Sequence, residues 1–151
     1  MAALQDAPEA FAATYEASAG KTEADWRAST QALYLVAAFD GARPVGLMAL
    51  IRHGAARIRH RGEIVMVWVR PEARGQGAAE AMLAAIADHG SATGLSQLEL
   101  SVNAESPRAV AFYQRAGFRP FGRVPSGLRV EDGFVDEILM VLPLDASLGG
   151  A

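Results

Sequence analysis

A glycine-rich turn lies between an apolar strand and an alanine-rich helix in the middle of this chain. Residues 64–69, Ile-Val-Met-Val-Trp-Val, are apolar on both faces, which is typical of a strand inside a sheet. Gly75 and Gly77 carry no Cβ, so a ligand can approach their backbone closely. Amides at the start of the next helix point outward with the positive end of its dipole. The stretch therefore predicts a strand–turn–helix unit that binds an anion such as a pyrophosphate.

Taken alone, this turn is a weak signal, because short glycine motifs also occur in ordinary tight connections. Arg70 and Arg74 flank it, and their guanidinium groups can donate charge-assisted hydrogen bonds to phosphate oxygens. The alternative to an anion-binding turn is a plain strand-to-helix connection. Only a second motif elsewhere in the chain can decide between the two.

Composition narrows the class of protein. The chain has 151 residues, 51% of them apolar and 21% charged, so we expect residues 1–151 to form a single globular domain. No apolar run approaches the ~20 residues of a membrane helix and no signal peptide is visible, so we expect a cytoplasmic protein. The net charge of −3 argues against nucleic-acid binding. The chain has no cysteine, which excludes metal sites built from thiolates. A thiol that takes part in the chemistry would therefore belong to a bound cofactor, and we expect no metal.

Hydrophobic periodicity and capping residues predict four helices and six strands. The helices are expected over 8–18 (opened by Pro8, stopped by Gly20), from Thr22 with a capping box to Asp25, over 77–89 (stopped by Gly90), and from Ser106 to Gly117. The strands are expected over 33–39, 44–52, 57–69, 95–102, 118–124 and 134–142, with a polar loop at 125–133.

This order predicts an α/β (α+β) fold with a mixed, mostly antiparallel sheet. The helix over 77–89 is a crossover, which makes strands 57–69 and 95–102 parallel neighbours. The glycine turn then lies at the carboxyl end of the first of these strands, where open sheets bind ligands.

A second motif follows the strand over 95–102: an asparagine, a capped helix with an inward tyrosine, and a Gly-Phe stop. With the glycine turn, it resembles the two signatures of the GCN5-related N-acetyltransferase family over about residues 33–142. The turn signature is matched by Arg74, Gly77 and Ala79, and the helix signature by Asn103, Tyr113, Gly117 and Phe118.

The resemblance implies that acetyl-CoA lies where the two parallel strands splay apart. Its pyrophosphate would sit on the amides of 75–79, its pantetheine would pair with the backbone near Trp68 and Val69, and the N–H of Val69 would hold the oxyanion. The implied cofactor-binding residues are Trp68, Val69, Arg70, Arg74, Gly75, Gln76, Gly77, Ala78, Ala79 and Asn103.

The resemblance also assigns the proton transfers. Tyr113 holds the family's general-acid position; its alternative is a tyrosine that packs the helix on the sheet. Glu63 is the candidate base on the strand leading to Val69, with water or a purely exposed glutamate as alternatives. Asn103 either anchors pantetheine or caps its turn.

Two charged groups bear on the acceptor. Arg57, Arg59 and Arg61 alternate along the expected strand and would share Glu63's face, ready for an anionic acceptor, unless they form a solvated hairpin end. An acidic rim of Asp132, Asp136 and Glu137 would instead favour a cationic amine.

The resemblance implies a further strand and a longer first helix before residue 8, for which too few residues precede Pro8. We therefore expect the first family strand to be missing, the edge of strand 33–39 to be open, and a homodimer to cover it, with the C-terminal strand as another route to pairing. The expected function is an N-acetyltransferase acting on a primary amine of a small molecule or peptide. A non-catalytic CoA-binding regulatory module is the alternative, and a nucleic-acid-binding domain is disfavoured by charge.

Overall fold

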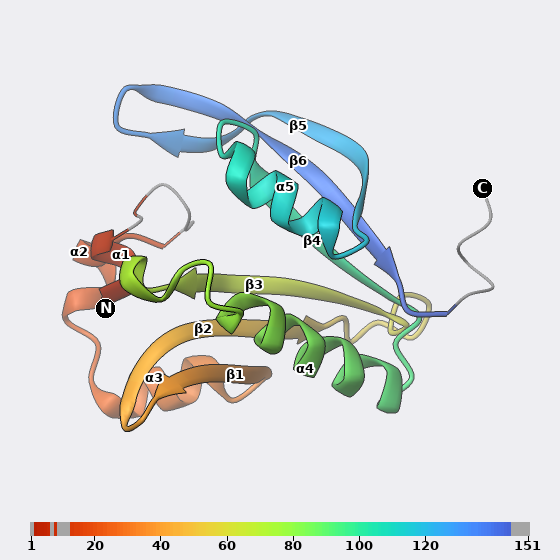
Figure 1. Ribbon diagram of the computed structural model, residues 1–151, viewed down its shortest axis with the longest axis horizontal. Coiled ribbons are helices and arrows are strands. Elements are labelled where there is room, and N and C mark those ends of the chain that lie inside the picture. The colour runs from red at the N-terminus through yellow and green to blue at the C-terminus, as the bar shows by residue number, and fades with distance from the viewer. Residues whose placement is uncertain (1, 7, 9–12, 146–151) are drawn as a thin grey trace.

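Six strands form one mixed sheet in the order β1-β2-β3-β4-β6-β5 (Figure 1). The computed structural model describes residues 2–6, 8 and 13–145. The strands are β1 (Leu33–Asp40), β2 (Arg43–Arg52), β3 (Arg61–Val69), β4 (Gln97–Asn103), β5 (Arg119–Val130) and β6 (Gly133–Pro143). Only β3 and β4 pair in parallel, and the other neighbours are antiparallel. The predicted fold class and the predicted parallel pair are confirmed.

Five α-helices accompany the sheet within the described residues: α1 (Ala2–Asp6), α2 (Tyr15–Ala19), α3 (Glu23–Thr30), α4 (Ala78–Ala92) and α5 (Pro107–Arg115). A short 3-10 turn, η2 (Pro71–Ala73), follows β3. The predicted capping box is present at α3, where the Thr22 hydroxyl accepts from the Asp25 amide and the Asp25 carboxylate accepts from the Thr22 amide. None of these helices is both long and apolar enough to cross a membrane.

The N-terminal region differs from the expected helix over 8–18. Residues 9–12 lie outside the described part, and the helix that follows begins only at Tyr15. It starts there because the Thr14 hydroxyl accepts the amide of Ala17 at 3.2 Å, a side-chain N-cap. Helix α1 was not predicted. Gly20 ends α2 as expected, and the described residues contain no strand before β1.

The core lies between the sheet and two helices on the same face. Fully buried side chains come from β2 (Met48, Leu50), α4 (Met82, Ile86), β4 (Leu98) and β6 (Met140). Tyr113 of α5 belongs to the same cluster, so α4 and α5 cover one face of the sheet, in front of it in Figure 1. Burying each such side chain contributes about 1.5–3 kcal/mol, which fixes both helices against the strands.

Three element boundaries differ from the sequence prediction. Residues 57–60 form a turn, so β3 begins at Arg61. Helix α4 continues past Gly90 to Ala92. Glycine at position 90 lets the helix pack closely on Leu144, because a Cβ there would lie 3.1 Å from Leu144 Cδ1. The polar segment 125–133 is largely strand. It bulges at Ser126, whose φ is 51°, while the Asp136 carboxylate accepts its amide.

Strands β3 and β4 are neighbours over only part of their length. Residues 61–63 of β3 pair with residues 97–99 of β4, while β4 continues along β6 to the register pair of Asn103 and Glu137. Figure 1 shows the two strands meeting at one end and diverging toward the end where β3 runs into η2. The backbone of β3 near Val69 is therefore left without a strand on that side.

Candidate functional site

A cleft of about 690 Å³ opens where β3 and β4 diverge. Its walls are the end of β3, the glycine turn, the start of α4 and one side of α5. The lining residues are Val67, Trp68, Val69, Ala73, Arg74, Gly75, Ala79, Glu80, Ser106, Pro107, Arg108, Ala109, Ala111, Phe112, Tyr113 and Arg115. The two motifs found in the sequence, 39 positions apart when counted from Arg74 to Tyr113, thus face one another across one cleft.

The glycine turn has the backbone that its sequence predicts. Gly75 and Gly77 have φ of 75° and 85°, in the left-handed region that favours glycine. A Cβ on either would meet nothing within 4 Å, so it would project into open space that a ligand can use. The first bond inside α4 runs from the Ala81 amide to the Gly77 carbonyl, which leaves the amides of 78–80 without helical partners. The turn can therefore bind an anion through its backbone.

Val69 presents its own backbone to the cleft. The Arg70 amide donates to the Val45 carbonyl at 2.8 Å, on one side of the register pair of Gly46 and Val69. In an antiparallel ladder this bond makes Gly46 and Val69 a non-hydrogen-bonded pair, so the N–H and C=O of Val69 point away from β2. They point toward the side that β4 has left. An extended ligand can pair with this edge as another strand would.

Arg74 is held at this edge by two contacts. Its Nε donates to the Val69 carbonyl at 2.9 Å, and its Nη2 donates to Asp6 Oδ2 of α1 at 2.5 Å. The same carboxylate oxygen accepts from the Trp68 indole at 2.9 Å. Asp6 thus joins the N-terminal helix to the end of β3 and to the glycine turn.

Arg70 and Gln76 do not line the cleft. The Nε of Arg70 donates to the Pro44 carbonyl at 2.9 Å, and its guanidinium lies 5.4 Å from the centre of the Trp68 ring. The Gln76 amide folds back and donates to the Glu72 carbonyl at 2.7 Å. Both side chains bind backbone carbonyls outside the cleft. Arg70 and Gln76 can therefore contact a ligand in the cleft through their backbone groups.

Tyr113 projects from α5 into the cleft while its ring stays buried at 6% exposure. Phe112 and Phe118 contact the ring edge-on, with centroids 5.0 and 5.5 Å away. Burial raises the pKa of the phenol above its usual value of 10, because the phenolate would lose hydration. The Tyr113 hydroxyl has no hydrogen-bond partner among the described residues, and the residue lines the cleft.

Asn103 and Glu63 also lie away from the cleft lining. The Asn103 carbonyl oxygen of the side chain accepts the Glu105 amide at 2.8 Å, which is the turn-capping contact considered from the sequence. Glu63 lies in the paired part of β3, opposite Glu99. Six residues separate it from Val69, at most about 20 Å, because the strand is interrupted by a bulge at Met66, whose φ is 58°.

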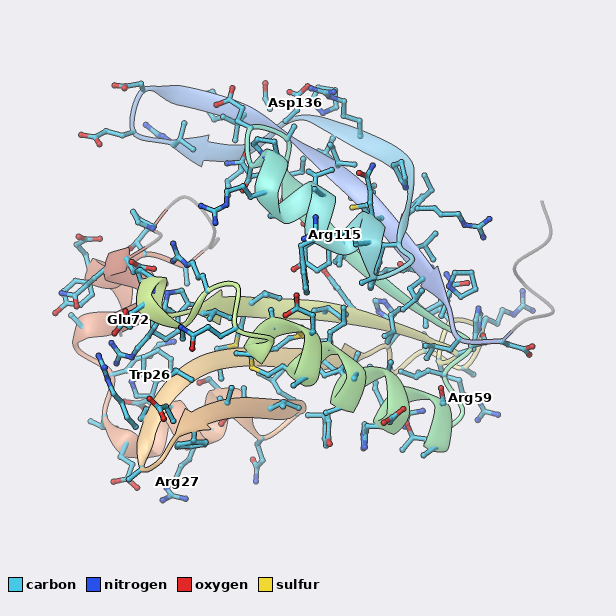
Figure 2. All side chains as sticks on the ribbon, viewed as in Figure 1. Trp26, Arg27, Arg59, Glu72, Arg115 and Asp136 are labelled. Atoms are coloured by element: carbon cyan, nitrogen blue, oxygen red, sulfur yellow. The ribbon has the colours of Figure 1, made fainter. Side chains whose placement is uncertain are left out.

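The expected face of three alternating arginines is wrong. Arg57 and Arg59 lie in the turn before β3, so they do not follow its pleat, and Arg61 binds Glu99 through two bonds of 2.5 and 2.6 Å. Figure 2 shows Arg59 and Glu72, which precedes the glycine turn, near opposite ends of the molecule. The arginines therefore do not gather at the cleft.

The acidic rim is partly occupied by its own partners. Asp136 accepts from Arg123 Nε at 2.6 Å, and Glu137 accepts from the Ser101 hydroxyl at 2.8 Å. Asp132 lies in the turn between β5 and β6. The described residues hold no group of three or more side chains arranged to bind a metal ion.

Sequence reasoning missed several residues of the cleft. Asp6 contacts the lining residue Arg74, 68 positions away, and no local pattern reveals this contact. Phe112, Arg108 and Arg115 lie on the predicted helix but outside the recognised motif. The helical spacing of 108 and 115 was the one available signal that these two arginines share a face.

Comparison with known proteins agrees with this geometry. Residues 2–118 match the family model described as the acetyltransferase (GNAT) family. No curated protein sequence matches the chain significantly.

Solved structures share the fold at low sequence identity. An N-acetyltransferase from Staphylococcus aureus Mu50 is 19% identical with a TM-score of 0.80, over 95% of this chain and 90% of that one. A ribosomal-protein-alanine N-acetyltransferase from Brucella melitensis is 20% identical with a TM-score of 0.78, over 94% and 90%. A putative acetyltransferase from Salmonella typhimurium, solved with its cofactor acetyl-CoA, is 17% identical with a TM-score of 0.71, over 80% and 71%.

Proposed function

Because the chain belongs to the acetyltransferase (GNAT) family and is an acyltransferase, we propose that it transfers the acetyl group of acetyl-CoA to a primary amine. The acceptor is a small molecule or a peptide, and the amine attacks directly in a ternary complex. One domain spanning residues 1–151 carries the activity. The observation that supports this most is the meeting of the glycine turn, the edge of β3 at Val69 that β4 leaves open, and Tyr113 in one cleft.

The glycine turn and the end of β3 bind the donor. Amides of residues 75–79, with Arg74 beside them, hold its pyrophosphate, since these donors lie at a helix N-terminus and lack other partners. Val69 pairs through its backbone with pantetheine along the open edge of β3, with Trp68 beside it. The acetyl thioester supplies the reactive carbonyl, and the Val69 N–H stabilises negative charge on its oxygen. Asn103 keeps the strand end and the start of α5 in place.

Tyr113 serves the leaving group. Its hydroxyl donates toward the departing sulfur, and the buried ring keeps the phenol protonated because its pKa is raised. An ordinary thiol has a pKa near 8.5, so a phenol with a still higher pKa gives up its proton only as charge builds on sulfur. Hydrogen-bond donation to the developing thiolate is thus the main contribution of Tyr113.

The attacking amine needs a base, because only its neutral form is a nucleophile. Glu63 accepts that proton, or a water molecule does so in its place. Glu63 lies outside the cleft lining, six residues before Val69, which favours transfer through water over direct contact.

A thiol-release assay with acetyl-CoA tests the proposal. The assay uses a panel of small amines, peptides with free N-termini, and aminoglycosides, and detects acetylated acceptor by mass. Consumption of at least one acceptor is expected. CoA binding with no acceptor consumed would instead favour the regulatory module, which needs neither Tyr113 nor a base. The Brucella neighbour is named for a ribosomal-protein alanine, so a peptide N-terminus belongs in the panel.

Edge strand β1 supports the expected homodimer. Its side chains Leu35 and Phe39 are 44% and 61% exposed, and among the described strands β1 pairs with β2 alone. Pairing of two copies through this edge would cover them. Light scattering at high concentration is the test, and a monomeric mass there would overturn the dimer while leaving the proposed reaction untouched.

A further inference from the structure

Two arginines of α5 line the cleft opposite the glycine turn. Arg108 and Arg115 are seven positions apart, so they lie about two turns apart on the same face of the helix. Figure 2 shows Arg115 between α5 and α4, and the residues of α4 that line the same cleft are Ala79 and Glu80. Tyr113 lines the same cleft, but its ring belongs to the buried core cluster, whereas both arginine side chains are exposed.

Neither arginine has a hydrogen-bond or ion-pair partner among the described residues, and both side chains are exposed. Several other arginines are held by the protein. Carboxylates bind Arg27, Arg43, Arg61, Arg74 and Arg123, and backbone carbonyls accept from Arg52 and Arg70. The guanidinium groups of Arg108 and Arg115 are thus free to bind a ligand in the cleft.

The cleft is lined mainly by positive charge, whereas the whole chain is negatively charged. The lining includes Arg74, Arg108 and Arg115 and a single carboxylate, Glu80, although the protein carries a formal charge of −3. Low-dielectric walls concentrate such a local field and attract anions. The cleft is therefore suited to more negative charge than Arg74 and the glycine turn alone would balance.

The position of Arg108 adds an energetic argument. It lies in the first turn of α5, directly after Pro107, where the positive end of the helix dipole disfavours a cation. No carboxylate among the described residues pairs with Arg108 to offset this repulsion. An anion bound in the cleft would relieve this repulsion, and it would also meet the free amides at the start of α5.

We propose that Arg108 and Arg115 bind the 3′-phosphate on the ribose of the acyl donor, apart from the pyrophosphate on the glycine turn. This rests on the proposed use of acetyl-CoA. A phosphate accepts several charge-assisted hydrogen bonds, and guanidinium groups match its geometry. The arginines lie on the wall facing the start of α4, so the adenosine end of the donor, beyond its pyrophosphate, is the part that reaches them. They make the enzyme selective for CoA over its 3′-dephospho form.

Calorimetric titration with CoA and with 3′-dephospho-CoA tests this directly. For the unmodified protein we expect CoA to bind roughly tenfold more tightly or better, the range for losing charge-assisted hydrogen bonds. Arg108→Ala and Arg115→Ala should each reduce this ratio, and the double variant should bring it near one. Affinity for 3′-dephospho-CoA should change little, which separates a lost phosphate contact from general damage to the cleft.

Matched variants control for charge and folding. Arg129→Ala removes one exposed arginine from β5, outside the cleft, and should leave the ratio as it was. Arg108→Lys with Arg115→Lys keeps the charge and should retain part of the preference. Equal affinity of the unmodified protein for both ligands would overturn the inference while leaving the proposed function intact, as would an unchanged ratio in the double variant. Failure to bind either ligand would overturn the proposed function as well.

Discussion

Arg61 and Glu99 form a two-point ion pair across β3 and β4, in the short stretch where these parallel strands are still neighbours. Arg61 Nε and Nη2 reach the two carboxylate oxygens at 2.5 and 2.6 Å. Gln97 also donates to Glu99 at 2.5 Å. Beyond these residues the strands diverge and the cleft opens. The pair therefore ties together the closed end of the fork in which the donor is proposed to lie.

Glu99→Gln should lower the free energy of unfolding by roughly 1–2 kcal/mol at neutral pH, because a partly buried, bidentate carboxylate is lost. The hydrogen bond from Arg61 lowers the pKa of Glu99 below its usual 4.5. Its stabilisation is therefore complete above that value and lost as the pH falls through the lower folded value. Denaturant titrations at several pH values should show the two proteins converging in acid.

Glu23→Gln is the control for that measurement. Glu23 pairs with Arg27 on the exposed surface of α3, where ion pairs contribute little. A loss equal to that of Glu99→Gln would contradict a special role for the pair between the strands.

Tyr113→Phe should lower kcat about tenfold or more while CoA affinity stays nearly constant. Phenylalanine keeps the ring contacts with Phe112 and Phe118, so the change removes only the hydroxyl. Steady-state kinetics and CoA titration measure the two quantities. Tyr34→Phe, whose ring stacks on His89 outside the cleft, should leave kcat unchanged. Normal turnover of the Tyr113 variant would remove this residue from the acid role.

The raised pKa of Tyr113 also predicts a pH profile. Since burial holds the phenol protonated above its usual value of 10, its ionisation should cause no loss of kcat between about pH 7 and pH 10. A descending limb in that range that disappears in Tyr113→Phe would contradict the assignment.

Gly77→Ala should weaken CoA binding and reduce stability. Alanine in the left-handed backbone at φ 85° costs about 1–2 kcal/mol, and its methyl group projects into the open space at the turn. Thermal melting and CoA titration would detect both effects. Gly20→Ala is a matched control, because Gly20 has φ −86° and a Cβ there meets nothing within 4 Å. It should preserve CoA affinity.

Glu63→Gln should shift the ascending limb of the rate–pH profile if Glu63 accepts the amine proton. The measurement is kcat/KM across pH with an acceptor found in the panel. A profile superimposable on that of the unmodified protein would assign the proton transfer to water and leave Glu63 as a strand residue beside Arg61.

The sequence predicted the elements whose causes are local. The capping box from Thr22 to Asp25 needs neighbours only three positions away, and it is present. The alternation of Leu98, Leu100 and Val102 with polar residues reports which face of β4 is buried. By contrast, the helix boundaries predicted at Pro8 and Gly90 are wrong, since α2 begins at Tyr15 and α4 continues to Ala92. Gly90 instead allows close packing against Leu144, which is distant in the sequence and therefore outside any local pattern.

For the candidate site, the sequence by itself determined the strand–turn–helix with Gly75 and Gly77 and the helix that carries Tyr113, because backbone conformation and helical spacing follow from nearby residues. Only the tertiary structure decided which side chains meet. Asp6 bridges Trp68 and Arg74, Arg61 pairs with Glu99 instead of facing an acceptor, and Arg108 and Arg115 share the cleft with the turn. These contacts join residues far apart in the chain, and they form only once the core has placed α4 and α5 on one face of the sheet.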